Sequence, residues 1–278
     1  MHAYLLPVRL LAAAARTVAA LALLSGAFLL VFDAFAGELG DPKAVLNRWV
    51  GFFFVAPWTF AWLLHRLSTA TLEVAPAQLV LTVGRARYEI PRTSVAAVRA
   101  WRFPVPGPGL SLRMTSGRTF RYGLSVPDPV PLLEALSRAG VSATDAQAHP
   151  ITRFAQAKHA ASRRRTLSRV LKYGVFPLAP TLLVFRLHQY IAFGGAFGEY
   201  YLKGLGPYLK TFFSFWAFTV AQLLCYASVW RALAELAAIS AAGFLPRRAG
   251  GVRRFAEIAC LLLYYVGIPA LVLVRALT

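Results

Sequence analysis

Hydrophobic residues in this chain gather in long runs, which occupy residues 17–35, 49–65, 174–197, 211–230 and 255–274. Each run has roughly the length of a helix that crosses the apolar core of a bilayer, about 17 to 25 residues. Between the second and third runs, residues 71–140 alternate between polar and apolar positions. We therefore expect five transmembrane helices and one small domain that needs water on its outer face.

The composition supports this division. Hydrophobic residues make up 58% of the 278 residues and the mean hydropathy is +0.57, whereas soluble domains hold about 45–50% apolar residues. The expected fold class is an α-helical integral membrane protein with a small α+β domain. Residues 34–36 read Ala-Phe-Ala, a signal-peptide cleavage pattern, but the run before them is long for a signal peptide, so we expect an uncleaved first span.

The charge of the chain predicts its orientation. The formal net charge is +19, which nucleic acid binding would explain, but Lys and Arg also gather in the cytoplasmic loops of polytopic proteins. Arg9 and Arg16 precede the first run, and basic residues far outnumber acidic ones in residues 65–172. We expect a multi-pass protein of the bacterial inner membrane with its N-terminus and polar domain in the cytoplasm, its C-terminus outside and no nucleic-acid partner.

The polar stretch has the pattern of short antiparallel strands followed by one helix. Segments rich in β-branched and aromatic residues, separated by Gly and Pro, occupy residues 78–83, 87–90, 95–103, 110–114 and 118–122. Thr115-Ser116-Gly117 predicts a hairpin turn. Residues 131–139 predict a helix that Gly140 ends. Such an order builds a small α+β module or a partly open barrel.

This stretch resembles a bacterial pleckstrin-homology-like (PH-like) domain. The likeness rests on the strand order, on Tyr88-Glu89-Ile90-Pro91, on Ser94-Val95-Ala96-Ala97-Val98, on the Ser-Gly-Arg hairpin and on the closing leucine helix. The rigid insert at residues 104–109 and a short first strand depart from it. The resemblance implies a cytoplasmic binding or assembly module, commonly self-associating, without catalytic residues. The expected domains are residues 1–70 (two spans), 71–140 (the PH-like domain), 141–172 (a linker and a basic helix) and 173–278 (three spans).

A basic helix is expected at residues 151–172. Its cationic side chains include four that can meet lipid headgroups: Arg163, Arg164, Arg165 and Arg169. A basic amphipathic helix can lie on an anionic leaflet. The alternative is a solvated linker whose charges only set the topology.

A polar group of residues occurs in and after the third run. The candidate binding residues are Arg186, His188, Gln189 and Glu199. Charged residues inside a span are functional hypotheses by default. The alternative is that Arg186 extends to the outer interface and that an interfacial loop begins near His188. Residues 174–197 can also re-enter the membrane instead of crossing it.

Further along the chain, Arg231 and Glu235 are four residues apart, so they can form a structural ion pair on one helix face. Glu257 can meet either Arg231 or the basic loop at residues 247–254. Cys225 and Cys260 lie in apolar runs without metal or redox spacing. No cofactor and no metal are expected.

Familiar catalytic motifs are absent from the sequence. The leading hypothesis is a non-enzymatic assembly or accessory subunit whose PH-like domain binds a protein partner or a second copy. The alternative is a transporter or lipid-handling component that uses the polar site around Arg186 and His188, with anionic phospholipid as a partner. A membrane enzyme that uses His188 and Glu199 as base and acid is the third hypothesis.

Overall fold

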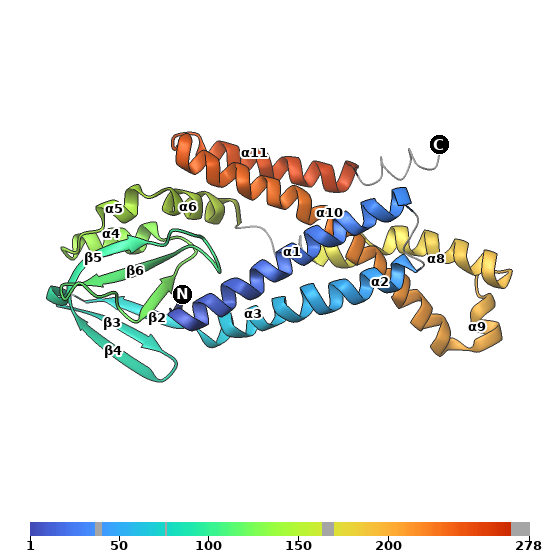
Figure 1. The fold of residues 1–278 in the computed structure, drawn as a ribbon, viewed down its shortest axis with the longest axis horizontal. Coiled ribbons are helices and arrows are strands. Elements are labelled where there is room, and N and C mark those ends of the chain that lie inside the picture. The colour runs from blue at the N-terminus through green and yellow to red at the C-terminus, as the bar shows by residue number, and fades with distance from the viewer. Residues whose placement is uncertain (37–40, 76, 163–169, 268–278) are drawn as a thin grey trace. The chain divides into compact units, whose positions relative to one another are not determined.

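The computed structural model describes residues 1–36, 41–75, 77–162 and 170–267 (Figure 1). The chain divides into two compact units. The first contains Met1–Val18, Pro57–Arg163 and Ala232–Thr278, and the second contains Ala19–Ala56 and Arg164–Arg231.

Three helical segments of the described residues are long and apolar enough to cross a membrane. The first lies in α1 (Leu6–Ala36). The second runs through α2 (Pro42–Trp49), a π-helical turn η1 (Val50–Val55) and α3 (Ala56–Leu67), and the third is α10 (Leu205–Phe244). They correspond to the first, second and fourth expected spans, and membrane association is thus supported by length and composition.

The expected third and fifth spans have a different form. The third is represented by a π-helical turn η3 (Leu171–Val175) and by α8 (Leu178–Phe193). The fifth begins as α11 (Ala249–Leu262) and a π-helical turn η4 (Leu263–Gly267), and its remaining residues lie outside the described part. The number of five spans therefore stays a prediction.

Helix α10 is one continuous helix of 40 residues. At about 1.5 Å per residue it is about 60 Å long, twice the thickness of the hydrocarbon core of a bilayer. The expected span at 211–230 and its expected alanine-rich continuation are therefore parts of the same helix.

The helices of the second unit pack through small and apolar side chains. Leu23, Leu46 and Ala221 are buried around Cys225, and a Cβ added at Gly26 would lie 2.9 Å from the Cys225 sulfur. The small residue at Gly26 thus lets α1 and α10 approach closely. Cys225 behaves as a small apolar residue here, and its thiol is free.

The first unit contains two antiparallel sheets among its described residues. The strands are β1 (His2–Leu5), β2 (Ala70–Val74), β3 (Gln78–Val83), β4 (Ala86–Pro91), β5 (Val95–Ala100), β6 (Gly109–Met114) and β7 (Tyr122–Ser125). The first sheet has the order β1-β7-β6-β5 and the second the order β2-β3-β4. The strand expected at residues 118–122 instead starts at Tyr122, where β1 pairs with it through Leu5.

Strand β1 joins the two sheets. It pairs with β7 along its whole length, and on its other side it reaches the chain that enters β2. There the Ala3 amide donates to the Ser68 carbonyl at 2.8 Å, and the Ala70 amide donates to the Met1 carbonyl at 2.9 Å. The first residues of the chain are therefore part of the sheet domain.

Helices α4 (Val130–Arg138) and α5 (Thr144–Ala148) close the core of the sheet domain. Leu133 and Leu136 of α4 are fully buried against Leu79, Val98 and neighbouring strand residues. Gly140 has a φ of +81°, the left-handed conformation expected after the end of a helix. The core extends past residues 71–140, because Ala143, Ala146 and β1 also contribute to it.

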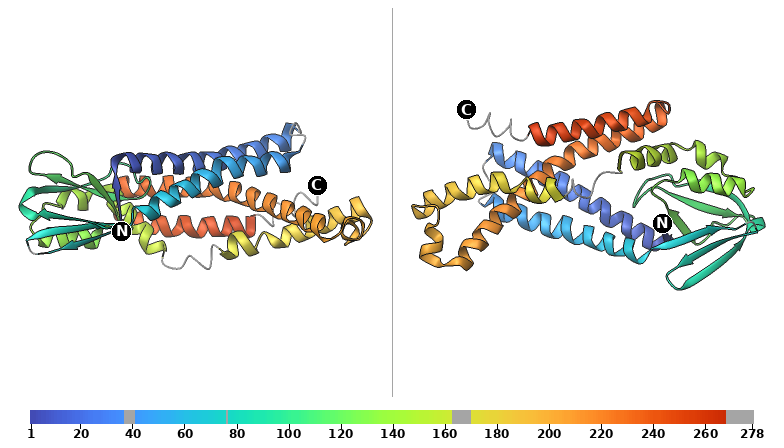
Figure 2. Two further views of the ribbon diagram at one scale, coloured as in Figure 1. Left: turned by 90° about the horizontal axis from the view of Figure 1, so that it is seen from below. Right: turned by 180° about the vertical axis from the view of Figure 1, so that it is seen from behind.

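Helix α6 (Pro150–Ser162) follows α5 and packs against α11. The C-terminal part of α10 and α11 lie side by side and run in opposite directions (Figure 2). Phe154 of α6 is buried with Ala238 and Ala242 of α10 and Ala249 of α11. These contacts bring charged side chains of three helices together.

Candidate functional site

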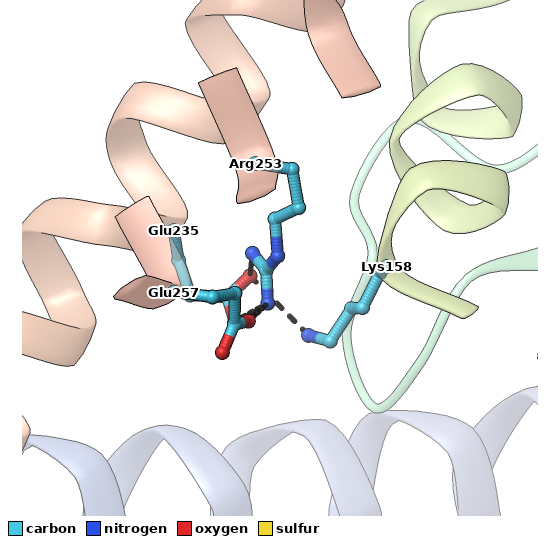
Figure 3. A network of polar contacts seen from close by, with 4 residues as sticks. All are labelled: Lys158, Glu235, Arg253 and Glu257. Carbon is cyan, nitrogen blue, oxygen red and sulfur yellow. Dashed lines mark hydrogen bonds and ion pairs between the residues drawn. The ribbon is translucent and has the colours of Figure 1, made fainter. Parts of the chain in front are cut away.

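A network of four charged residues links α6, α10 and α11 (Figure 3). Two nitrogens of the Arg253 guanidinium lie 3.0 Å from the two carboxylate oxygens of Glu235, and one of them also lies 2.8 Å from Glu257. On the other side of Glu235, the Lys158 ammonium lies 3.3 Å away. Two cations and two carboxylates thus compensate one another.

Arg253 is the centre of this network. Its side chain is 1% exposed, and a charge so deeply buried is stable only when it is paired. The Phe154 ring lies 5.9 Å from the guanidinium carbon and shields the pair from water. The arrangement is that of a structural clamp, since each of its four charged groups has an oppositely charged partner within the network.

The predicted pair of Arg231 and Glu235 remains a prediction. Glu235 contacts Arg253 and Lys158. Glu257 meets Arg253, which belongs to the basic segment that the sequence offered as one of its two partners. Lys158 was not expected in the network, because its distance of 77 residues from Glu235 gives no local pattern.

In the second unit, the structure brings together two of the four predicted binding residues. Gln189 of α8 donates from Nε2 to a Glu199 oxygen at 2.9 Å, and its Oε1 accepts from the Glu199 backbone amide at 3.2 Å. Thr211 of α10 donates to the other Glu199 oxygen at 2.9 Å. Both Gln189 and Glu199 are buried. This triad joins α8, α9 (Gly198–Lys203) and α10.

Arg186 and His188 do not join this triad. Arg186 is exposed, and the ring of His188 lies 5.0 Å from that of Phe215 and 6.0 Å from that of Phe193. His188 of α8 thus lies among aromatic rings and not beside Gln189 in the triad. The four residues therefore do not form a single polar site in the structure.

The four arginines predicted to contact lipid headgroups, Arg163, Arg164, Arg165 and Arg169, lie outside the described residues. Among the described residues, no group of three or more His, Cys, Asp or Glu side chains could hold a metal ion.

The sequence did not predict a polar cluster where β1 meets α1 and α3. The His2 and His65 rings stack with their centroids 3.5 Å apart, and the Tyr4 hydroxyl lies 2.5 Å from Nδ1 of His65. Tyr4 and His65 are 61 residues apart in the sequence, so only the pairing of β1 brings them together. With only four residues, His2–Leu5, β1 is too short to show the alternating pattern of a strand in the sequence.

Trp101 packs next to this cluster. Its indole lies over Gly109 and Gly123, where an added Cβ would come within 2.8 Å of the ring, and it donates from Nε1 to Ser111 at 2.9 Å. The Arg9 guanidinium carbon lies 3.6 Å from the centre of the indole on its other side. Such stacking is a favourable cation–π contact and holds α1 on the sheet domain.

Burial changes the ionisation of the groups in β1. Burial lowers the pKa of His2, and the positive charges of the N-terminal amine and of Arg16 lower it further, against a hydrogen bond with the His65 backbone. Burial also raises the pKa of Tyr4. At the start of β7, a hydrogen bond with Tyr88 raises the pKa of Tyr122.

Comparison with protein families, with curated proteins and with solved structures finds no match to this chain. The function must therefore be argued from the residues themselves.

Proposed function

We propose that this chain is a non-enzymatic assembly or accessory subunit of the bacterial inner membrane, whose PH-like sheet domain binds a protein partner or a second copy. The observation that carries the proposal is an open sheet edge at β4. Edge strands present unpaired backbone groups, which other chains can extend by adding a strand.

The two edges of the first sheet, β1 and β5, are at least partly occupied. Strand β1 is bonded to β7 on one side and to the segment before β2 on the other. Strand β5 is partly covered, because the Val98 amide donates to the Ser142 carbonyl at 2.9 Å. In the part of the chain that the structure describes, β4 has β3 as its one strand neighbour.

The register shows which groups of β4 face outward. The Arg92 amide donates to the Ala77 carbonyl across the end of the β3–β4 pair. Since bonded and non-bonded pairs alternate in an antiparallel ladder, the backbone groups of Arg87 and Glu89 point away from β3. Pro91, which has no amide to donate, also falls on a non-bonded position. The outward groups of Arg87 and Glu89 are thus available to a partner strand.

The pairing of β1 supports the proposed orientation. Two candidate spans, Leu6–Asp33 and Lys43–Leu67, separate β1 from the remaining strands. A chain that crosses a bilayer twice returns to the side where it began, and β1 lies in the same sheet as β7. The excess of basic residues around this domain favours the cytoplasmic side.

The alternative of a transporter or lipid-handling component has less support. It relied on one polar site around Arg186 and His188, but Arg186 is exposed and His188 lies among aromatic rings. The hydrogen bonds of Gln189 and Glu199 to each other and to Thr211 serve a structural role.

The variant Glu89→Pro tests the open edge. It removes one outward amide but no bond of the β3–β4 ladder, because proline is tolerated on the free side of an edge strand. We expect the wild-type complex to dissociate in this variant, as measured by native mass spectrometry in mild detergent. Glu89→Ala is the matched control, since it removes the carboxylate and its ion pair with Arg87 but keeps the amide.

Dissociation in Glu89→Pro with an intact complex in Glu89→Ala supports pairing through the β4 edge. An intact complex in both variants, each with the unfolding temperature of the wild type, contradicts it.

A further inference from the structure

A group of cationic side chains lines the junction between α1, α3 and β1. On α1, Arg9, Ala12 and Arg16 are spaced three and four residues apart and therefore share one helix face. Ala12 is fully buried against Tyr4 and Trp101. This face of α1 is thus turned toward β1 and the sheet domain, with an arginine one turn to either side of Ala12.

Two histidines and the chain terminus lie next to these arginines. His2 comes from β1 and His65 from the last turn of α3, and their rings stack on one another. The charges of Arg16 and of the Met1 amine both act on His2, so these groups lie close to it. The Nδ1 atom of His2 is buried and has no hydrogen-bond partner among the described residues.

The cluster lacks compensating negative charge. In the described parts of the chain, neither Arg9 nor Arg16 forms an ion pair with a carboxylate. Tyr4 is the acidic group beside them, and burial raises its pKa, so it stays neutral. Partly buried cations without a counter-ion are costly, and an anion that binds among them would relieve that cost.

We propose that Arg16, His2 and His65, with Arg9 at the edge, bind a phosphate group at this junction. Arginine guanidinium and imidazole N–H groups are good phosphate donors, and arginine matches the oxygen geometry of phosphate especially well. The site lies at the start of the candidate span Leu6–Asp33, the depth at which lipid headgroups occur. The phosphate is carried either by an anionic phospholipid or by a free anion.

An aromatic residue near the site agrees with a position at the level of the lipid headgroups. Trp62 of α3 is exposed, and the Arg66 guanidinium carbon lies 5.1 Å from the centre of its ring. Tryptophan and arginine gather where a membrane protein meets the headgroups. The proposal is independent of the β4 edge and of any assembly through it.

Native mass spectrometry of the full chain, delipidated and incubated with phosphatidylglycerol or with phosphatidylethanolamine, tests the site. We expect wild-type protein to retain phosphatidylglycerol preferentially and Arg16→Gln to retain about tenfold less, the loss of one charge-assisted contact. Arg85→Gln is the matched control, because Arg85 is exposed in the β3–β4 turn, and it should retain lipid like the wild type. A second arm adds inorganic phosphate as competitor.

Displacement of the lipid by millimolar inorganic phosphate would identify a free phosphate as the ligand, whereas retention would identify the lipid headgroup. Equal retention of both lipids by the wild type, or undiminished phosphatidylglycerol in Arg16→Gln, overturns the proposal. Arg16→Gln removes an uncompensated charge, so its unfolding temperature should not fall. If that variant does not fold, Arg9→Gln carries the same expectation.

Discussion

At the residue scale, the polar side chains that matter most are those placed by contacts between distant parts of the chain. His2 lies against His65, 63 residues later in the sequence, because β1 pairs with the sheet next to the end of α3. Burial and two neighbouring positive charges then favour its neutral form. The ionisation of His2 is therefore coupled to the pairing of β1.

This coupling predicts a pH dependence. A histidine whose folded-state pKa lies below its unfolded value of 6.5 takes up fewer protons when folded, so its contribution to stability is lost as the pH falls through and below 6.5. The groups facing it are Tyr4 on β1, His65 on α3, Arg16 on α1 and the Met1 amine. We expect His2→Asn to gain thermal stability relative to the wild type at pH 5 but not at pH 8.

Thermal unfolding in detergent at both pH values measures this difference. His159→Asn, which replaces an exposed histidine of α6, is the control and should follow the wild type at both pH values. If the stability of the wild type and that of His2→Asn change equally from pH 8 to pH 5, the coupling is refuted.

Some residue-level features could be predicted from the sequence and others could not. Gln189 and Glu199 were named as candidates because they are polar residues in or near an apolar run, and both are buried. Their partner Thr211 and the exposure of Arg186 depend on how α8 turns into α9 and α10, which no spacing rule shows. The contact of Glu235 with Lys158 could not be predicted for the same reason, since Lys158 lies on another helix.

At the scale of elements, the charge network decides how α6 is attached to α10 and α11. Each helix contributes at least one charge, and apolar packing around Phe154 surrounds them. Removing one partner of a buried ion pair leaves an uncompensated charge and costs roughly 3–5 kcal/mol. Replacing Arg253 should lower the stability most, because Arg253 pairs with both carboxylates.

We therefore expect Arg253→Met to destabilise the chain by roughly 3–5 kcal/mol, with the largest increase in amide hydrogen exchange in α6 and α11. Arg254→Met is the control, because Arg254 is the exposed neighbour of Arg253 and its replacement should leave exchange unchanged. Equal exchange in the two variants would show that the network does not hold these helices together.

The sequence predicted most helices and strands of the sheet domain because their periodicity and their Gly and Pro boundaries are local. The strands β3 and β6, helix α4 and the stop at Gly140 are found where the pattern placed them. Strand β1 was missed because four residues before a long apolar run carry too little periodicity. Its place in the sheet follows from pairing with β7, more than 110 residues later.

At the scale of the whole molecule, the apolar runs could be predicted from composition, but the number of crossings could not. Only three described helices meet the length and hydropathy of a span. The PH-like likeness is part of the proposal, supported by the two sheets, the closing helix α4 and the pairing of β1 with β7, whereas the five-span topology stays a prediction.

The central claim is that the chain works as a subunit of an assembly. Native mass spectrometry of the wild-type protein, mildly solubilised from its own membrane, tests it most directly. We expect a defined homo-oligomer or a complex with another membrane protein, which dissociates at higher detergent concentration. A lone monomer across all mild detergents would contradict the claim.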